Sequence, residues 1–195
     1  MRMARWTLVA CSLALLVACG GGGGGSSPST SQPPPVAKAT GLSYTDPVSG
    51  DFRLVKDAGS TNSKIILRLV GPAASTGRGV SFTFNVDPAM ADLVKVADSD
   101  AEYVQNGDAF VLGDAPRFLK GIKQGGILRV TVSQKGPGLS TPLNATLLKV
   151  ALQFKPSANL NAGTAIPLSV VEGQYLPAAG GPLSMSVVSG SLQAQ

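Results

Sequence analysis

The chain has 195 residues, 16 basic and 11 acidic side chains, a formal charge of +5, and no histidine. Without histidine it cannot build a Ser-His-Asp or Cys-His catalytic arrangement, and it lacks the commonest protein ligand for transition metals. The charge excess is small and the basic residues are scattered, so the composition predicts no nucleic-acid binding.

The first segment in chain order has the pattern of an export signal. Arg2 and Arg5 precede an apolar run from Trp6 to Val17, which is shorter than the roughly twenty residues of a membrane-spanning helix. We therefore assign residues 1–18 to a signal peptide, and its removal lowers the formal charge from +5 to +3 because both arginines are lost. A buried helix of a cytoplasmic protein is the alternative, but the glycine run that follows does not suit a protein core.

The end of this segment, Leu16-Val17-Ala18-Cys19, resembles the lipobox of bacterial lipoproteins. The resemblance implies cleavage before Cys19 and acylation of its thiol and new amine, which together anchor a protein stably in a bilayer. Gly20 stands where an aspartate would favour inner-membrane retention, so the expected location is the outer membrane. The alternative is an ordinary secreted protein in which Cys19 remains a free thiol.

Residues 19–40 are predicted to be the lipidated cysteine and a disordered linker rich in Gly, Ser and Pro. Cys11 is lost with the signal peptide, so no thiol other than that of Cys19 remains in the mature chain. With no histidine, no free thiol and no glycine-rich loop leading into a helix, we expect no cofactor.

Residues 41–195 are predicted to form one all-β domain, because glycine and proline separate short runs rich in Val, Leu, Ile, Thr and Phe. The segment Gly79–Val86 alternates most clearly, with Val80, Phe82 and Phe84 on one face. Residues 87–92 are predicted to form a single helical turn with Asp87 as N-cap. The other predicted strands are 52–55, 64–70, 109–112, 118–123, 126–133, 146–154, 165–176 and 183–192.

Three stretches resemble the cohesin pattern: GVSFTFNVDPAMADLVKV (79–96), GGILRVTVSQKGPGLSTPLNATLLKVALQFKPSA (125–158) and NLNAGTAIPLSVVEGQYLPAAGGPLSMSVVSGSLQ (159–193). The resemblance implies an antiparallel jelly-roll β-sandwich of about nine strands, a fold that cohesins share with certain carbohydrate-binding modules. Cohesins bind dockerin domains through a sheet face, and the related modules bind polysaccharide. The expected partner is therefore an envelope or extracellular protein, or a polysaccharide.

Four acidic residues lie close together in the stretch DSDAEYVQNGD: Asp98, Asp100, Glu102 and Asp108. Two converging carboxylates could act as a glycosidase, and the spacing of Asp98, Asp100 and Glu102 makes them weak calcium candidates. The EF-hand pattern is absent, and a solvated connection between strands explains the same residues.

Tyr44, Tyr103 and Tyr175 are the candidate ligand-binding aromatics, because sugar sites use exposed rings and the only tryptophan lies in the signal peptide. Half-buried rings with surface hydroxyls are the alternative. Lys120 and Lys123 are expected to protect a sheet edge. The sequence thus predicts a membrane-anchored, non-enzymatic binding module for protein recognition or envelope assembly. The alternatives are a carbohydrate-binding lipoprotein and a carboxylate-only glycoside hydrolase.

Overall fold

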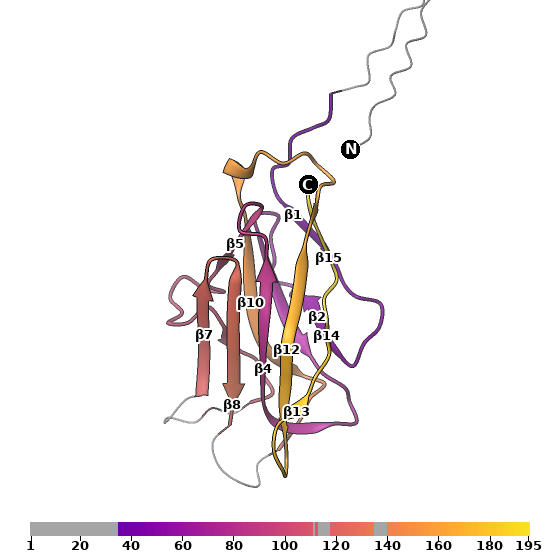
Figure 1. Cartoon of the computed structure of the whole chain (residues 1–195), viewed down its shortest axis with the longest axis vertical. Helices are drawn as coiled ribbons and strands as arrows, with labels where there is room; N and C mark the ends of the chain where they lie inside the picture. The colour runs from indigo at the N-terminus through magenta and orange to yellow at the C-terminus, as the bar shows by residue number, and fades with distance from the viewer. Residues whose placement is uncertain (1–34, 111, 113–117, 135–139) are drawn as a thin grey trace, which may run out of the picture. The chain divides into compact units, whose positions relative to one another are not determined.

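The computed structural model describes residues 35–110, 112, 118–134 and 140–195 (Figure 1). Residues 35–195 form a compact unit of their own. The predicted signal peptide, the lipobox, Cys19 and most of the linker lie outside the described residues. Ten of the described strands have four or more residues and five have two, and the only helical element assigned in this part is the 3-10 turn η1 (Pro156–Ala158).

Two six-stranded sheets form a sandwich, which confirms the predicted all-β fold. The first, here called the β4 sheet, has the order β13-β12-β4-β8-β7, and β9 also pairs with β4. Its strands are β13 (Leu183–Ser184), β12 (Leu168–Pro177), β4 (Thr76–Val86), β8 (Ile127–Ser133), β7 (Phe118–Gln124) and β9 (Thr141–Pro142).

The second sheet, here called the β10 sheet, has the order β14-β2-β3-β10-β5, and β6 also pairs with β10. Its strands are β14 (Val187–Val188), β2 (Phe52–Lys56), β3 (Lys64–Val70), β10 (Thr146–Phe154), β5 (Ala91–Val94) and β6 (Gln105–Asn106). The pairing of β14 with β2 is parallel, whereas the other strand pairs are antiparallel.

A third sheet of three short strands joins the two chain ends of the unit. In it β15 (Ser191–Ala194) lies between β1 (Leu42–Thr45) and β11 (Ala165–Ile166). Thr40 N–H and Gly41 N–H both donate to the Gln195 carbonyl, at 2.6 and 2.8 Å. Figure 1 shows the start of the coloured chain beside the C-terminus.

The core lies between the two large sheets and consists of the apolar half of each alternating strand. The alternation predicted for β4 is confirmed, since Val80, Phe82 and Phe84 are buried. The same holds for β8, and Leu128, Val130 and Val132 are fully enclosed. The run at 146–154, which could also be read as a helix, is strand β10.

The turn predicted at residues 87–92 is present at its start but is shorter than predicted and is not a helix, because β5 begins at Ala91. The Asp87 carboxylate accepts the Ala89 N–H at 2.9 Å, and the Asp87 carbonyl accepts the N–H groups of Met90 and Ala91.

Several boundary predictions need correction. The predicted strand at 165–176 divides into β11 and β12, and the run predicted at 183–192 divides among β13, β14 and β15, which lie in three different sheets. The predicted strand at 109–112 is wrong at its described positions, because Ala109, Phe110 and Leu112 belong to no strand. Phe110 is buried in the core, and its carbonyl accepts the Asn106 side-chain amide at 2.7 Å. Residues 37–40, predicted to be linker, instead pair with the loop at 160–162 and with Gln195, which places them in the folded unit.

Candidate functional site: the outer face of the β4 sheet

The outer face of the β4 sheet is formed by the polar half of each alternating strand. In β4 this half contains Ser81, Thr83 and Asn85, and the strand register places residues of the neighbouring strands directly beside them. Three rows result across β7, β8, β4 and β12. They are Gln124–Ile127–Asn85–Ser169, Ile122–Arg129–Thr83–Val171 and Lys120–Thr131–Ser81–Gln174.

Apolar side chains interrupt this otherwise polar face. Ile122 is 54% exposed, Ile127 38% and Val171 43%, although large β-branched residues are normally inside. Ile122 and Ile127 are diagonal neighbours on adjacent strands, which brings their side chains within reach of one another. We call Ile122, Ile127, Arg129 and Val171 the docking patch.

The polar side chains of the face are largely bonded to one another. The Ser81 and Thr131 hydroxyls lie 3.1 Å apart, and the Asn85 amide donates to the Ser169 hydroxyl at 3.3 Å. Their geometry is therefore set before any partner arrives, which reduces the entropy cost of binding.

A bulge in β12 brings a carboxylate onto the same face. The register between β12 and β4 shifts between Val171 and Gln174, and Glu172 adopts a positive φ of 55° there. The Glu172 carboxylate accepts the Thr83 hydroxyl at 2.9 Å. A positive φ is uncommon for a residue other than glycine. β-bulges change the direction of a side chain and are frequent next to functional sites.

A shallow, mainly apolar groove of about 170 Å³ continues the face towards the β12–β13 hairpin. Gly79, Ser133, Leu176 and Pro182 are among the residues that line it, and the strand register places Gly79 between Ser133 and Leu176. The backbone of β8 and Ser133 pack closely against Gly79, so a side chain at this position would be crowded.

The β7 edge of the face is protected by the connection that follows β5. The Glu102 carboxylate accepts the Gly121 backbone N–H at 3.2 Å and the Lys120 ammonium at 2.9 Å. The hydrogen bond from Lys120 is the main cause that lowers the pKa of Glu102; burial opposes it, and the Gly121 N–H and the charge of Lys120 add to the lowering. Lys123 donates to the Leu93 carbonyl at 2.8 Å, and thus links the two sheets. Both predicted lysines therefore sit at the sheet edge.

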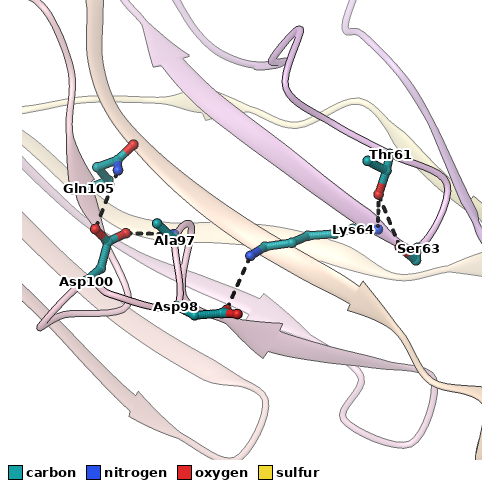
Figure 2. Close-up of polar contacts among 7 residues, drawn as sticks. All are labelled: Thr61, Ser63, Lys64, Ala97, Asp98, Asp100 and Gln105. Atoms are coloured by element: carbon teal, nitrogen blue, oxygen red, sulfur yellow. Dashed lines mark hydrogen bonds and ion pairs between the residues drawn. The ribbon is translucent and has the colours of Figure 1, made fainter.

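The predicted acidic cluster does not converge. Asp98 is fully exposed and lies 3.9 Å from the Lys64 ammonium, whereas the Asp100 carboxylate turns back to the Ala97 N–H at 2.8 Å and to the Gln105 amide at 3.5 Å (Figure 2). Glu102 is bonded to β7, as described above.

Asp108 is exposed on the other sheet, beside Lys56 and Arg68. Among the described residues, no three carboxylates gather closely enough to hold a metal ion. The calcium candidates Asp98, Asp100 and Glu102 are therefore wrong as a joint site.

Tyr44 needs correction as a candidate ligand-binding residue, because it is only 7% exposed and its hydroxyl is used inside the fold. The hydroxyl donates to the Leu54 carbonyl at 2.8 Å and accepts the Gly190 N–H at 2.6 Å. Burial raises the pKa of Tyr44 to about 12; the Gly190 bond opposes the shift, and the nearby Asp46 charge adds to it. Tyr44 thus ties β1, β2 and the start of β15 together.

Tyr103 and Tyr175 are both half-buried, in separate places. The Lys123 ammonium lies 5.3 Å from the centre of the Tyr103 ring, a cation–π distance. The Tyr175 ring lies 5.5 Å from that of Phe52, between the two sheets. The three tyrosines therefore do not form one exposed aromatic platform.

These features describe an antiparallel β-sandwich whose distinctive surface is an extended sheet face. No protein-family model matches the chain, and no curated protein matches it. The described residues contain no helical segment with the length and hydropathy of a membrane span.

Solved structures of cohesin modules share the fold. The second type II cohesin module of the adaptor ScaA scaffoldin of Acetivibrio cellulolyticus matches with a TM-score of 0.56 and 13% identity, over 73% of this chain and 87% of that one. The cohesin of the Coh3ScaB–XDoc complex from the same organism matches with a TM-score of 0.55 and 13% identity, over 72% and 95% of the two chains. The sixth scaffoldin B cohesin of that organism, in complex with the Cel5 dockerin, matches with a TM-score of 0.50 and 11% identity, over 73% and 97%. The chain therefore has a cohesin-like β-sandwich fold.

Proposed function

We propose that this chain is a non-enzymatic binding module that docks a protein partner on the outer face of the β4 sheet. The observation that carries the proposal is the docking patch. Three of the seven large hydrophobic side chains exposed in the described part of the chain lie on this one face. Cohesin modules of this fold occur in complexes with dockerins, and this likeness of fold supports the proposal.

The face has the chemistry of a protein interface. Its centre combines branched apolar side chains with a single exposed cation, Arg129, and arginine is enriched at such surfaces. The partner should therefore present apolar side chains to Ile122, Ile127 and Val171 and a carboxylate or carbonyl oxygen to Arg129.

The dispersion of the acidic residues supports a binding role over catalysis. Asp98, Asp100 and Glu102 each have a separate partner, so two of them do not face one another across a cleft as glycoside hydrolysis requires.

The proposal includes a lipid anchor at Cys19 and residence in the bacterial outer membrane. The support is the sequence Leu16-Val17-Ala18-Cys19-Gly20 and the Gly-, Ser- and Pro-rich composition of the segment after it, which is typical of a linker between a lipid anchor and a domain.

A pull-down from envelope extract with the full-length protein as bait tests the docking face. We expect a stoichiometric protein partner, and we expect Ile122→Asp and Ile127→Asp to weaken its binding at least tenfold, since each places a charge at the centre of an apolar contact. Both positions are more than a third exposed, so each variant should still fold with a loss of about 1 kcal/mol, since aspartate is a poor strand residue.

Val48→Asp is the matched control, because Val48 is fully exposed on the loop between β1 and β2, away from the face. Equal loss of binding in this control and in the two face variants would contradict the proposed surface. Unchanged binding in both face variants would contradict it as well.

Cell fractionation of a Cys19→Ser variant tests the anchor separately. The variant should leave the membrane fraction or accumulate with its signal peptide uncleaved, because the atom that would be acylated is gone. A normally processed, membrane-bound Cys19→Ser protein would refute the anchor and leave the docking proposal untouched.

Glycan binding is a second candidate function, and the position of Tyr175 favours it. Tyr175 lines a hollow of about 320 Å³ together with Asp51, Ser75 and Ser184, which combines an aromatic ring with hydroxyl and carboxylate groups. Retention on a polysaccharide panel that is lost in Tyr175→Ala and kept in Ile122→Asp would support this candidate over protein docking.

A further inference from the structure

Three basic side chains gather on the outer face of the β10 sheet. The strand register places Arg68 of β3 directly beside Lys149 of β10, and Lys56 ends the neighbouring strand β2. All three line an open hollow of about 600 Å³, together with Asp57 and Asp108. Three cations and two carboxylates leave this hollow with a net charge of +1.

One of the two carboxylates is already engaged. Asp57 is only 15% exposed at its side chain, and it accepts the Lys149 ammonium at 2.9 Å and the Gly59 N–H at 2.9 Å. Burial raises the pKa of Asp57, but the Gly59 and Lys149 hydrogen bonds and the charges of Lys149 and Arg68 outweigh it and hold the pKa below its ordinary value. Asp57 therefore stays charged and is occupied by Lys149.

Arg68 acts on Asp57 only through its charge. It is half-buried, and among the described residues its guanidinium makes no hydrogen bond or close ion pair. Its neighbour across the strand pair is the like-charged Lys149, and like charges placed directly opposite destabilise a sheet. An arginine kept in this position has five donors in a planar fork, which suit a bound oxyanion.

We propose that this hollow binds the carboxylate, sulfate or phosphate group of an anionic ligand, with Arg68 as the main contact and Lys56 as a second cation. The volume of the hollow lies in the range of small-molecule sites, so it suits an acidic sugar better than a bare inorganic ion. Asp108 lies among the lining residues and is exposed, where it could accept a hydroxyl of the same ligand.

This inference is independent of the docking proposal, because the hollow lies on the outer face of the other sheet. The residues that line it belong to β2, β3, β10 and the connections beside them, whereas the docking patch belongs to β7, β8 and β12. A ligand in the hollow and a protein on the patch would not compete.

Isothermal titration of the full-length protein at low salt tests the site with three probes: a glucuronate-containing trisaccharide, its neutral glucose counterpart and inorganic phosphate. We expect the uronate to bind and the neutral sugar not to bind. Arg68→Gln should weaken uronate binding by about tenfold or more, because it removes charge-assisted hydrogen bonds. Lys56→Gln should weaken it by a smaller factor.

Arg53→Gln is the matched control, since Arg53 lies on β2 of the same sheet but does not line the hollow. Asp108→Asn removes a negative charge from the hollow and should strengthen binding of inorganic phosphate about two- to threefold at low salt. Circular dichroism should show the wild-type fold in both the Arg53→Gln and the Asp108→Asn variants.

One result would change the ligand assigned to the hollow, and three results would overturn the proposal. Phosphate that binds as tightly as the uronate would support an oxyanion site but assign it to a free inorganic ion. Equal binding of the neutral sugar, equal losses in Arg68→Gln and Arg53→Gln, or no binding of any probe at millimolar concentration would overturn the proposal.

Discussion

Replacing Tyr44 by phenylalanine removes one buried hydroxyl and leaves the ring in place. The hydroxyl joins the Leu54 carbonyl at 2.8 Å to the Gly190 N–H at 2.6 Å, and the side chain is 7% exposed, so water cannot replace it. Each hydrogen bond nets about 1 kcal/mol, and unsatisfied buried partners add to the loss, so the free energy of unfolding should fall by about 2–3 kcal/mol. For a domain of about 160 residues this corresponds to a fall in Tm of roughly 5–10 °C.

Urea unfolding followed by circular dichroism measures this loss. The slope of the transition should stay constant, because the surface exposed on unfolding hardly changes. Tyr175→Phe is the matched control: no hydrogen bond of the Tyr175 hydroxyl is described, so its removal should change stability by less than about 0.5 kcal/mol. A Tyr44→Phe loss as small as that of the control would refute the reasoning.

Three further predictions concern pH and packing. Because the folded state raises the pKa of Tyr44 from 10.0 to about 12, the stability that this residue contributes is intact below pH 10 and is lost as the pH rises towards 12. The stability gap between the wild type and Tyr44→Phe should therefore narrow between about pH 10 and about pH 12 in urea titrations. Glu102→Gln should cost at most about 1 kcal/mol at neutral pH. Since the hydrogen bond from Lys120 lowers the pKa of Glu102, this difference should vanish as the pH falls below the ordinary value of 4.5. Gly79→Ala should destabilise by about 1–3 kcal/mol, measured by thermal unfolding, because strand β8 closely surrounds the place of a new Cβ. Gly181→Ala, with no atom within 4 Å of its Cβ, should not.

The two large sheets could be predicted from the sequence because their strands carry the period of a half-buried strand. In β4 from Val80 onward, and in β8 from Leu128 onward, each apolar residue alternates with a hydroxyl, amide or charged residue, and this local pattern defines the inner and outer faces. The outer face of the candidate site follows from the same alternation. The alternation along a strand does not determine the pairing register between strands. It is this register that places Ile122, Arg129, Thr83 and Val171 in one row.

The errors have a common physical cause, which is that burial and pairing are different properties. The apolar run at 109–112 includes Phe110, which is buried in the core, yet its described residues, Ala109, Phe110 and Leu112, belong to no strand. The local pattern does not predict strand β1, which has four residues and pairs with residues 191–194 at the other end of the folded unit. The burial of Tyr44 is equally hidden from the sequence, because its hydroxyl bonds to Leu54 on another strand and to the distant Gly190.

The adjacency of the two ends of the folded unit makes the domain a candidate for circular permutation. Gln195 exchanges backbone hydrogen bonds with Gly41, so a short peptide could join the ends without disturbing β1 or β15. New ends could be opened at Gly180–Gly181, an exposed hairpin tip where the backbone has open space around it. In the permuted protein the chain ends would lie at the β12–β13 hairpin and the same sheet face would stay exposed, so the point at which a further segment is attached could be changed without changing the fold.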